Sequence, residues 1–212
     1  QSADGSWEGS IVKTIQRLFG LHLTVREGVE PVQRGLDWLE EQTRAVFSRS
    51  RAQLPEKIAT HELAGLPFTK SAFLPLLTGA TLFLFRVFER GDDPEIREMY
   101  ARLEAGGYAG FGGSYGWSSR NNILRAFVVH PVYAGSRLID RMVGDLKRAQ
   151  KSSGLWPRAV PIYQTVNALA HLDRREADAQ LAPAFERLYR TQRRNGTWGR
   201  NQQEWNAFLV VH

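Results

Sequence analysis

The stretch Gln150-Lys151-Ser152-Ser153-Gly154-Leu155-Trp156 lies between an amphipathic segment and a more apolar one. It reads glutamine, three residues, glycine, one residue, tryptophan, and the same spacing occurs near both ends of the chain. A spacing that recurs at equivalent places is typical of folds that stack one structural unit on the next. The repeated positions are Gln1, Gly5 and Trp7, then Gln150, Gly154 and Trp156, then Gln192, Gly196 and Trp198.

The segments on either side of these stretches have helical periodicity. The segment 179–192 places Leu181, Phe185 and Leu188 on one face, which is typical of an amphipathic helix. The segments after each tryptophan are more apolar all round, and such helices must be buried. We therefore predict two layers of helices. Outer helices are expected at about 31–47, 94–105, 136–150 and 179–192, and inner helices at about 11–23, 70–89, 119–130, 160–172 and 202–212.

The fold class that follows is all-α, an (α/α) toroid of about five inner and four to five outer helices, with the ring not necessarily complete. One domain over residues 1–212 accounts for the pattern, with irregular insertions at 48–69 and 106–117. The first insertion contains Pro55 and Pro67, and the second is rich in glycine, which is costly inside a helix. The chain starts without methionine and ends within an apolar run, so we expect it to be a portion of a longer polypeptide.

Each repeated residue type suits a helix end. A glutamine amide can satisfy the backbone groups that a helix terminus leaves without partners. Glycine permits the left-handed backbone or close approach that often follows a helix. Tryptophan fills the wedge between neighbouring helices with a large ring and one N–H donor. The motif therefore predicts architecture, and carries no chemistry of its own.

The Gln-x3-Gly-x-Trp stretches at residues 1–25 and 136–212 resemble the repeat of squalene and oxidosqualene cyclases. The related superfamily includes class II diterpene cyclases and the β subunits of protein prenyltransferases. The resemblance implies a ring of inner and outer helices around an apolar cavity that takes an isoprenoid-type ligand. Between residues 25 and 136 only the alternation of helices supports it.

The catalytic motifs of those families are missing from the sequence. Class II cyclases protonate their substrate with an aspartic acid from Asp-x-Asp-Asp, and the chain has no such stretch. It has no cysteine, which removes the Asp, Cys and His zinc set of the prenyltransferases as well as disulfides and a cysteine nucleophile. We therefore expect no metal and no cofactor, assign no catalytic residue, and leave open whether the chain is an enzyme.

Polar residues on the predicted inner helices are candidates for lining the cavity. Counting eight residues from each tryptophan, or from Trp117, gives Ile15, Arg125, Gln164 and Asn206; counting eleven gives Leu18, Val128, Asn167 and Leu209. Polar groups on buried helices are costly unless they are paired, so they mark either a ligand cavity or contacts between helices. The candidates are Asn122, Arg125, Tyr163, Gln164, Asn167, His171 and Asn206.

Charge and hydropathy limit the partners. The net charge of +6 comes without a basic run interleaved with aromatic residues, so nucleic acid is not expected. The longest apolar run, Phe73 to Phe88, falls short of the roughly 20 residues of a membrane-spanning helix. We expect an apolar small molecule as partner, with peripheral membrane contact compatible with the sequence, and a cytoplasmic or peripheral membrane location.

Three function classes are compatible with the sequence. The first is a terpenoid cyclase-like or prenyltransferase-like toroid with a cavity for an apolar ligand. The second is a helical-repeat module that binds a ligand or a protein without chemistry. The third is a polysaccharide lyase-like toroid, suggested by Asn122, Arg125, Tyr163 and His171, because lyases use such neutral and basic groups to abstract a proton beside a carboxylate.

Overall fold

A computed structural model describes residues 1–48, 73–106 and 116–212, and within these ranges every regular element is a helix, which confirms the all-α prediction. In chain order they are α1 (Ile11–Thr24), α2 (Glu30–Ser48), α3 (Phe73–Val87), α4 (Pro94–Gly106), α5 (Trp117–Val128), the 3₁₀ helix η3 (Tyr133–Gly135), α6 (Arg137–Ala149), α7 (Ile162–Ala170), α8 (Arg175–Thr191) and α9 (Gln203–Val211).

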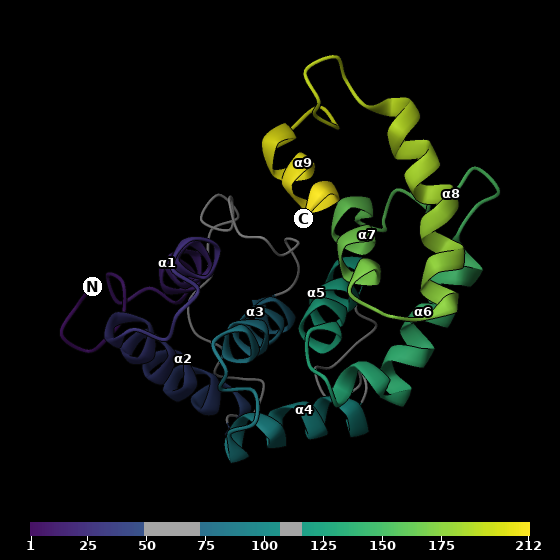
Figure 1. Cartoon of the computed structure of the whole chain (residues 1–212). Helices are drawn as coiled ribbons and strands as arrows, with labels where there is room; N and C mark the ends of the chain where they lie inside the picture. Colours follow the sequence, from purple (N-terminus) through teal and green to yellow (C-terminus); the bar gives the residue numbers. More distant parts are fainter. Residues whose placement is uncertain (49–72, 107–115) are drawn as a thin grey trace.

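The helices form two curved layers (Figure 1). Helices α2, α4, α6 and α8 follow the outer edge, and α1, α3, α5, α7 and α9 lie inside them. Within the inner layer α1 contacts α3, α3 contacts α5, α5 contacts α7 and α7 contacts α9. The rings of Phe19 in α1 and Trp205 in α9 meet edge to face with centroids 5.8 Å apart, so the first and last inner helices also touch.

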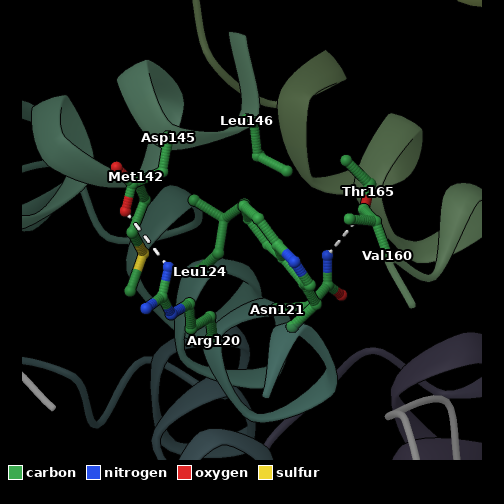
Figure 2. A pocket seen from close by; sticks show the side chains of 9 residues that line it. Arg120, Asn121, Leu124, Met142, Asp145, Leu146, Val160 and Thr165 are labelled. Atoms are coloured by element: carbon green, nitrogen blue, oxygen red, sulfur yellow. Dashed lines mark hydrogen bonds and ion pairs between the residues drawn. The ribbon is translucent and has the colours of Figure 1, made fainter. Parts of the chain in front are cut away.

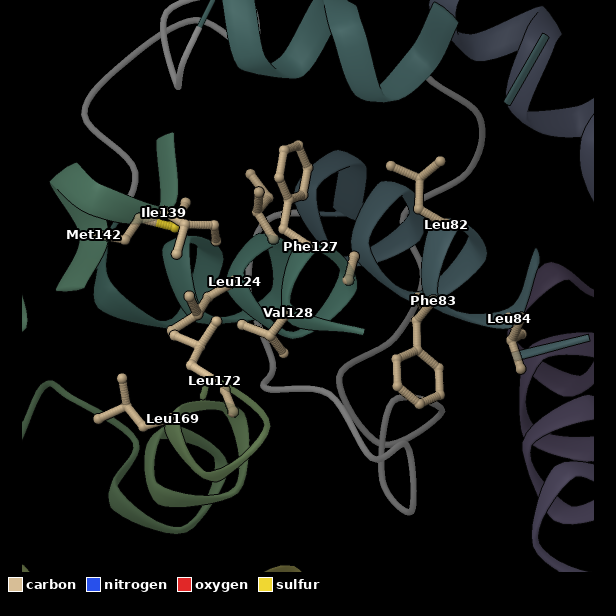
Figure 3. Packing of buried hydrophobic residues seen from close by; sticks show 14 of the residues in the cluster. Leu82, Phe83, Leu84, Leu124, Phe127, Val128, Ile139, Met142, Leu169 and Leu172 are labelled. Carbon is tan, nitrogen blue, oxygen red and sulfur yellow. The ribbon is translucent and has the colours of Figure 1, made fainter. Parts of the chain in front are cut away.

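Burial explains why the two kinds of helix differ in sequence. Helix α5 is buried over nine of its residues, from Ser119 to Val128, because it has neighbours on nearly every side. Helix α6 buries only the stripe Leu138, Ile139, Met142, Val143 and Leu146, and turns its charged face outward. Figure 3 shows part of the resulting core, to which α3, α5, α6 and α7 contribute side chains.

The layers are further joined by a tyrosine. Tyr100 of α4 is fully buried, and its hydroxyl lies 3.1 Å from the carbonyl oxygens of both Leu82 in α3 and Ala126 in α5. A buried hydroxyl without such partners would cost free energy, so this contact fixes one outer helix over two inner ones. No helix in the described ranges is both long and apolar enough to cross a membrane.

The three Gln-x3-Gly-x-Trp stretches form the same turn. In each one the backbone N–H after the glutamine donates to the carbonyl before the tryptophan, as in Lys151 to Leu155 at 2.8 Å. The glutamine amide donates to the glycine carbonyl at 2.8, 2.9 and 3.0 Å in the first, second and third turns. The glycines have φ of +91°, +79° and +80°, a left-handed backbone that favours glycine.

Two of the turns also hold the next outer helix. The second N–H of Gln1 donates to the Pro31 carbonyl of α2 at 2.7 Å, and that of Gln150 donates to the Gln180 carbonyl of α8 at 2.8 Å. Each of these acceptors stands 30 residues after its glutamine. An outer helix is therefore fastened by hydrogen bonds to the turn that closes an earlier unit.

The glycines of these two turns lie against the docked helix. A Cβ atom at Gly5 would come within 2.3 Å of the Arg34 carbonyl oxygen, and one at Gly154 within 2.2 Å of the Pro183 carbonyl oxygen. At Gly196 of the third turn a Cβ atom would meet nothing described within 4 Å. At Gly5 and Gly154 glycine is thus required because the docked helix lies so close. At Gly196 it is required only for its left-handed backbone conformation.

The tryptophans complete each turn. The indole N–H of Trp156 donates to Leu146 at 2.9 Å, and that of Trp198 to Leu188 at 2.7 Å, each carbonyl lying ten residues earlier in the preceding outer helix. Both rings are nearly inaccessible to solvent, whereas Trp7 is half-buried. The Trp7 ring packs closely against Gly35 of α2, since a Cβ atom added to Gly35 would be only 2.8 Å from the ring.

Several predicted boundaries were wrong. Helix α8 starts at Arg175 rather than 179, α5 at Trp117 rather than 119, and α7 is shorter than 160–172. Gly106 and Trp117 belong to helices, and so does Ser48, so the predicted insertions 106–117 and 48–69 were too long at these ends. Gly116 is described, and its extended backbone caps α5. The rest of both insertions lies outside the described residues, as do residues 70–72 of the inner helix predicted at 70–89.

We predict that Gly154→Ala destabilises the protein more than Gly196→Ala. Both substitutions place alanine in a left-handed backbone, which costs about 1–2 kcal/mol. Only at Gly154 would the new methyl also collide with the α8 backbone, and overpacking of this kind adds about 1–3 kcal/mol. Urea unfolding of the two variants measures the difference, and equal losses would show that α8 does not press on this turn.

Candidate central cavity

A cavity of about 420 Å³ lies at the centre of the inner layer. All five inner helices line it, and this volume is within the range of about 300–1,000 Å³ typical of small-molecule sites. The described lining residues are Phe19, His22, Leu23 and Arg26 from α1 and the turn after it, Phe83 and Val87 from α3, Arg125 and Val129 from α5 and its C-terminal end, Asn167 and His171 from α7 and its end, and Phe208 and His212 from α9 and its end.

The lining combines apolar surface with basic groups. Two arginines and three histidines face the cavity, and no aspartate or glutamate stands among its described lining residues. The apolar part consists of phenylalanine, leucine and valine side chains from α1, α3, α9 and the C-terminal end of α5. Such a lining favours a molecule that is mostly apolar and carries negative charge at one place.

Arg125 is the most buried of the basic groups, with only 4% of its surface exposed. Its guanidinium donates to the Asn167 Oδ1 atom at 3.3 Å, and it lies over the Phe83 ring, 5.9 Å from the centroid. Burial lowers its pKa to about 10, so it stays protonated at neutral pH. A guanidinium at this depth is costly to desolvate, so the polar groups around it have to pair with it.

His22 sits among aromatic rings. The ring centroids of Phe19, Phe83 and Phe88 lie 6.1, 5.8 and 5.9 Å from its own. Burial lowers its pKa, and the charges of Arg26 and His212 lower it further. Its Nδ1 atom is buried and accepts no hydrogen bond from any described residue. The ring is therefore neutral at pH 7. Its Nδ1 atom can accept a hydrogen bond from a ligand, or donate one if it carries the hydrogen.

His171 is oriented by its own helix. Its Nδ1 atom lies 2.7 Å from the Asn167 backbone carbonyl, one turn earlier. A carbonyl oxygen can only accept, so Nδ1 carries the hydrogen, which leaves Nε2 as the acceptor in the neutral ring. Asn167 thus positions two cavity groups, Arg125 through its side chain and His171 through its backbone.

The structure brings three of the seven predicted cavity residues to this cavity, namely Arg125, Asn167 and His171. The others are absent from its described lining. Asn206 donates to the Trp198 and Asn201 carbonyls at 3.1 and 2.9 Å, so its amide shapes the turn before α9. The Tyr163 hydroxyl lies beside Gly199 in that same turn. Asn122 is fully buried where α5 crosses Gly79 of α3, and Gln164 is half-buried.

The prediction missed the contribution of α1, and the sequence contained the signal for it. His22 stands fifteen residues after Trp7 (22 − 7), and His171 stands fifteen after Trp156 (171 − 156). Counting only eight and eleven residues from each tryptophan stopped too early along the inner helices. The cavity lies toward their C-terminal ends, and most of its lining residues stand ten to sixteen residues after a tryptophan.

A second, much smaller pocket lies between α5, α6 and α7 (Figure 2). Its volume is about 10 Å³, room for about one water molecule. Asn121 donates to the Thr165 hydroxyl at 3.0 Å, and Arg120 to Asp145 at 3.2 Å, across its walls. These bonds join neighbouring helices, so this pocket is a packing feature. Among the described residues no group of three or more His, Asp or Glu side chains is placed to hold a metal ion.

A comparison of the chain with protein families, curated proteins and solved structures finds no match. The cavity and the sequence pattern are therefore the features of this chain that point to a function.

We predict that acid weakens the fold through His22. Its pKa is lower in the folded chain than the ordinary value of 6.5, so between these two values the unfolded chain binds more protons. The stabilisation is present above pH 6.5 and is lost as pH falls through the folded pKa. His22→Phe, which keeps an aromatic ring, should reduce the slope of unfolding free energy against pH below 6.5. An unchanged slope would contradict a buried neutral His22.

Proposed function

We propose that this chain is a ligand-binding (α/α) toroid of the squalene-cyclase and prenyltransferase type, which holds an apolar, isoprenoid-type molecule in its central cavity. The observation that carries the proposal is the cavity of about 420 Å³ to which every inner helix contributes. The shared geometry of the three Gln-x3-Gly-x-Trp turns adds support, because it repeats the unit from which such a ring is assembled.

The ligand carries an anionic head. Its apolar part packs against Phe19, Phe83 and Phe208, and its head lies near Arg125. The Asn167 side chain, already bonded to the guanidinium at 3.3 Å, keeps Arg125 directed to that place. A charged hydrogen bond of this kind contributes about 1.5–3 kcal/mol, which corresponds to roughly a tenfold to hundredfold gain in affinity.

Binding without chemistry is the form of this function that the residues favour. Protonation of an alkene needs a carboxylic acid, and the sequence lacks Asp-x-Asp-Asp. None of the described cavity residues is acidic. The lyase-like alternative needs Asn122, Arg125, Tyr163 and His171 together, and only Arg125 and His171 are described as lining the cavity. We therefore propose no catalytic residue.

Two ligands that differ only in the head test this function. Isothermal titration should show that geranylgeranyl phosphate binds more tightly than geranylgeraniol, because only the phosphate engages Arg125. Arg125→Met should lower the affinity for geranylgeranyl phosphate by about tenfold or more and leave the affinity for geranylgeraniol unchanged. Arg148→Ala is the matched control, because Arg148 is an exposed arginine on the outer face of α6.

Three results would contradict the proposal. The first is that neither compound binds. The second is that Arg125→Met lowers the affinity for both compounds equally. The third is that Arg148→Ala lowers the affinity for geranylgeranyl phosphate. Mass spectrometry of the recovered compounds should find them unchanged, whereas a cyclic product would overturn the non-catalytic assignment.

A further inference from the structure

Helix α7 and the residue that caps its C-terminal end present one hydrogen-bond donor and one acceptor to the central cavity. The donor is the Nδ2 atom of Asn167 and the acceptor is the Nε2 atom of His171, and neither has a partner among the described residues. The two residues stand four positions apart, which places their Cβ atoms about 5–6 Å from each other on one face of the helix. One small ligand group can therefore reach both atoms.

The role of Asn167 as a donor follows from its bond to Arg125. A guanidinium only donates hydrogen bonds, so the amide atom that lies 3.3 Å from the Arg125 Nη2 atom is the oxygen. The amide nitrogen, with its two hydrogens, is then the atom left for a ligand. Asn167 is only 9% exposed, and an N–H group at such depth costs free energy while it lacks an acceptor. A ligand that offers an acceptor at this place removes that cost.

The role of His171 as an acceptor follows from its own helix. Its Nδ1 atom donates to the Asn167 backbone carbonyl at 2.7 Å, so the lone pair of the neutral ring lies on Nε2. The same bond holds the ring in place, so Nε2 keeps its direction relative to the Asn167 amide. His171 is exposed, whereas Asn167 is nearly buried one turn earlier, so the acceptor lies nearer to solvent than the donor.

A hydroxyl group matches this pair, because a hydroxyl both accepts and donates a hydrogen bond. It accepts from the Asn167 Nδ2 atom and donates to the His171 Nε2 atom. An ionised phosphate or carboxylate oxygen has no hydrogen to donate and would face the lone pair of the His171 ring. The anionic head of the ligand therefore belongs at Arg125, which lies at the oxygen end of the same Asn167 amide.

We propose that the ligand of the central cavity carries a free hydroxyl group beside its anionic head, held between Asn167 and His171. The assignment rests on the proposed function, which places the head at Arg125, and it narrows the ligand to a hydroxylated apolar anion. One amide bonds Arg125 at its oxygen and the hydroxyl at its nitrogen, so the head and the hydroxyl stand on neighbouring carbon atoms. Since the donor and the acceptor are fixed on one helix, the site also selects one configuration at the carbon that bears the hydroxyl.

Phytanyl phosphate and the two epimers of 2-hydroxyphytanyl phosphate, which differ at the carbon that bears the hydroxyl, provide the test. The epimers contain the same groups and carry the same charge, so a difference between their affinities arises from the site. Isothermal titration should show that one epimer binds about fivefold more tightly than the other or better, because only this epimer makes both hydrogen bonds. The tighter epimer should also bind more tightly than phytanyl phosphate.

Variants on α7 locate the hydroxyl in the cavity. His171→Leu removes the acceptor and should make the affinities of the two epimers equal, and the exposed position of His171 leaves the fold intact. Gln164→Leu is the matched control, because Gln164 lies on the same helix but is absent from the described cavity lining. This control should keep the difference between the epimers. In ¹⁵N spectra of the protein, the His171 Nε2 signal should shift more with the tighter epimer than with phytanyl phosphate.

The outcomes separate a failure of this assignment from a failure of the proposed function. If the epimers bind equally while Arg125→Met still lowers the affinity for phytanyl phosphate, the hydroxyl assignment is wrong and the proposed function stands. A difference between the epimers that survives His171→Leu would also overturn the assignment. If neither phytanyl phosphate nor the hydroxylated compounds bind, the proposed function is wrong and the hydroxyl assignment with it.

Discussion

A primary carboxamide has two N–H donors, and the arrangement of the outer helices depends on where the second one goes. In Gln1 and Gln150 the first donor closes a turn of the chain, and the second reaches a carbonyl thirty residues later in the following outer helix. One side chain therefore links the end of one unit to the next. The Gln180 carbonyl lies where solvent reaches it only in part, so it needs such a donor, and no aliphatic side chain can supply one.

The remainder of each unit adapts to this link. Glycine lets the docked helix approach to a distance that a methyl group would prevent, as at Gly5 and Gly154. The indole of Trp156 then bonds back to the preceding outer helix, so the second turn contacts outer helices on both of its sides. The inner helices are held at the centre as a consequence, and the cavity between them follows from the curvature of the layers (Figure 1).

Much of this architecture could be predicted from residue spacing, because helix type and turn type are local properties. The alternation of amphipathic and apolar segments indicated which helices lie outside and which inside. The start of α8 was missed because its first turn, with Glu176 and Asp178, is charged and buries little besides Ala177, so no apolar period reveals it. Trp117 was placed before a helix by analogy with the other tryptophans, but Gly116 caps α5 one residue earlier.

The position of the cavity could not be predicted in the same way. Asn206 and His171 differ by seven residues in their distance from the preceding tryptophan, which is about 10 Å along a helix. Where five helices diverge enough to leave a space depends on how they cross, a property of no single segment. Arg125 was identifiable because a charged residue inside an apolar helix is unusual at any depth. His22 was within reach of a longer count from Trp7, but only the structure shows the rings of Phe19 and Phe83 beside it.

The most direct measurement of the central claim is the unfolding free energy of Gln150→Glu against that of Gln192→Glu. Glutamate keeps the shape of glutamine, but its carboxylate accepts hydrogen bonds and donates none. At Gln150 the substitution places a carboxylate next to two carbonyl oxygens, which repel it. At Gln192 it places the carboxylate next to one carbonyl oxygen, which is exposed. Urea unfolding should show that Gln150→Glu is less stable than Gln192→Glu by about 2 kcal/mol or more. Equal stability of the two variants would contradict the claim that the glutamine amide fastens one unit to the next.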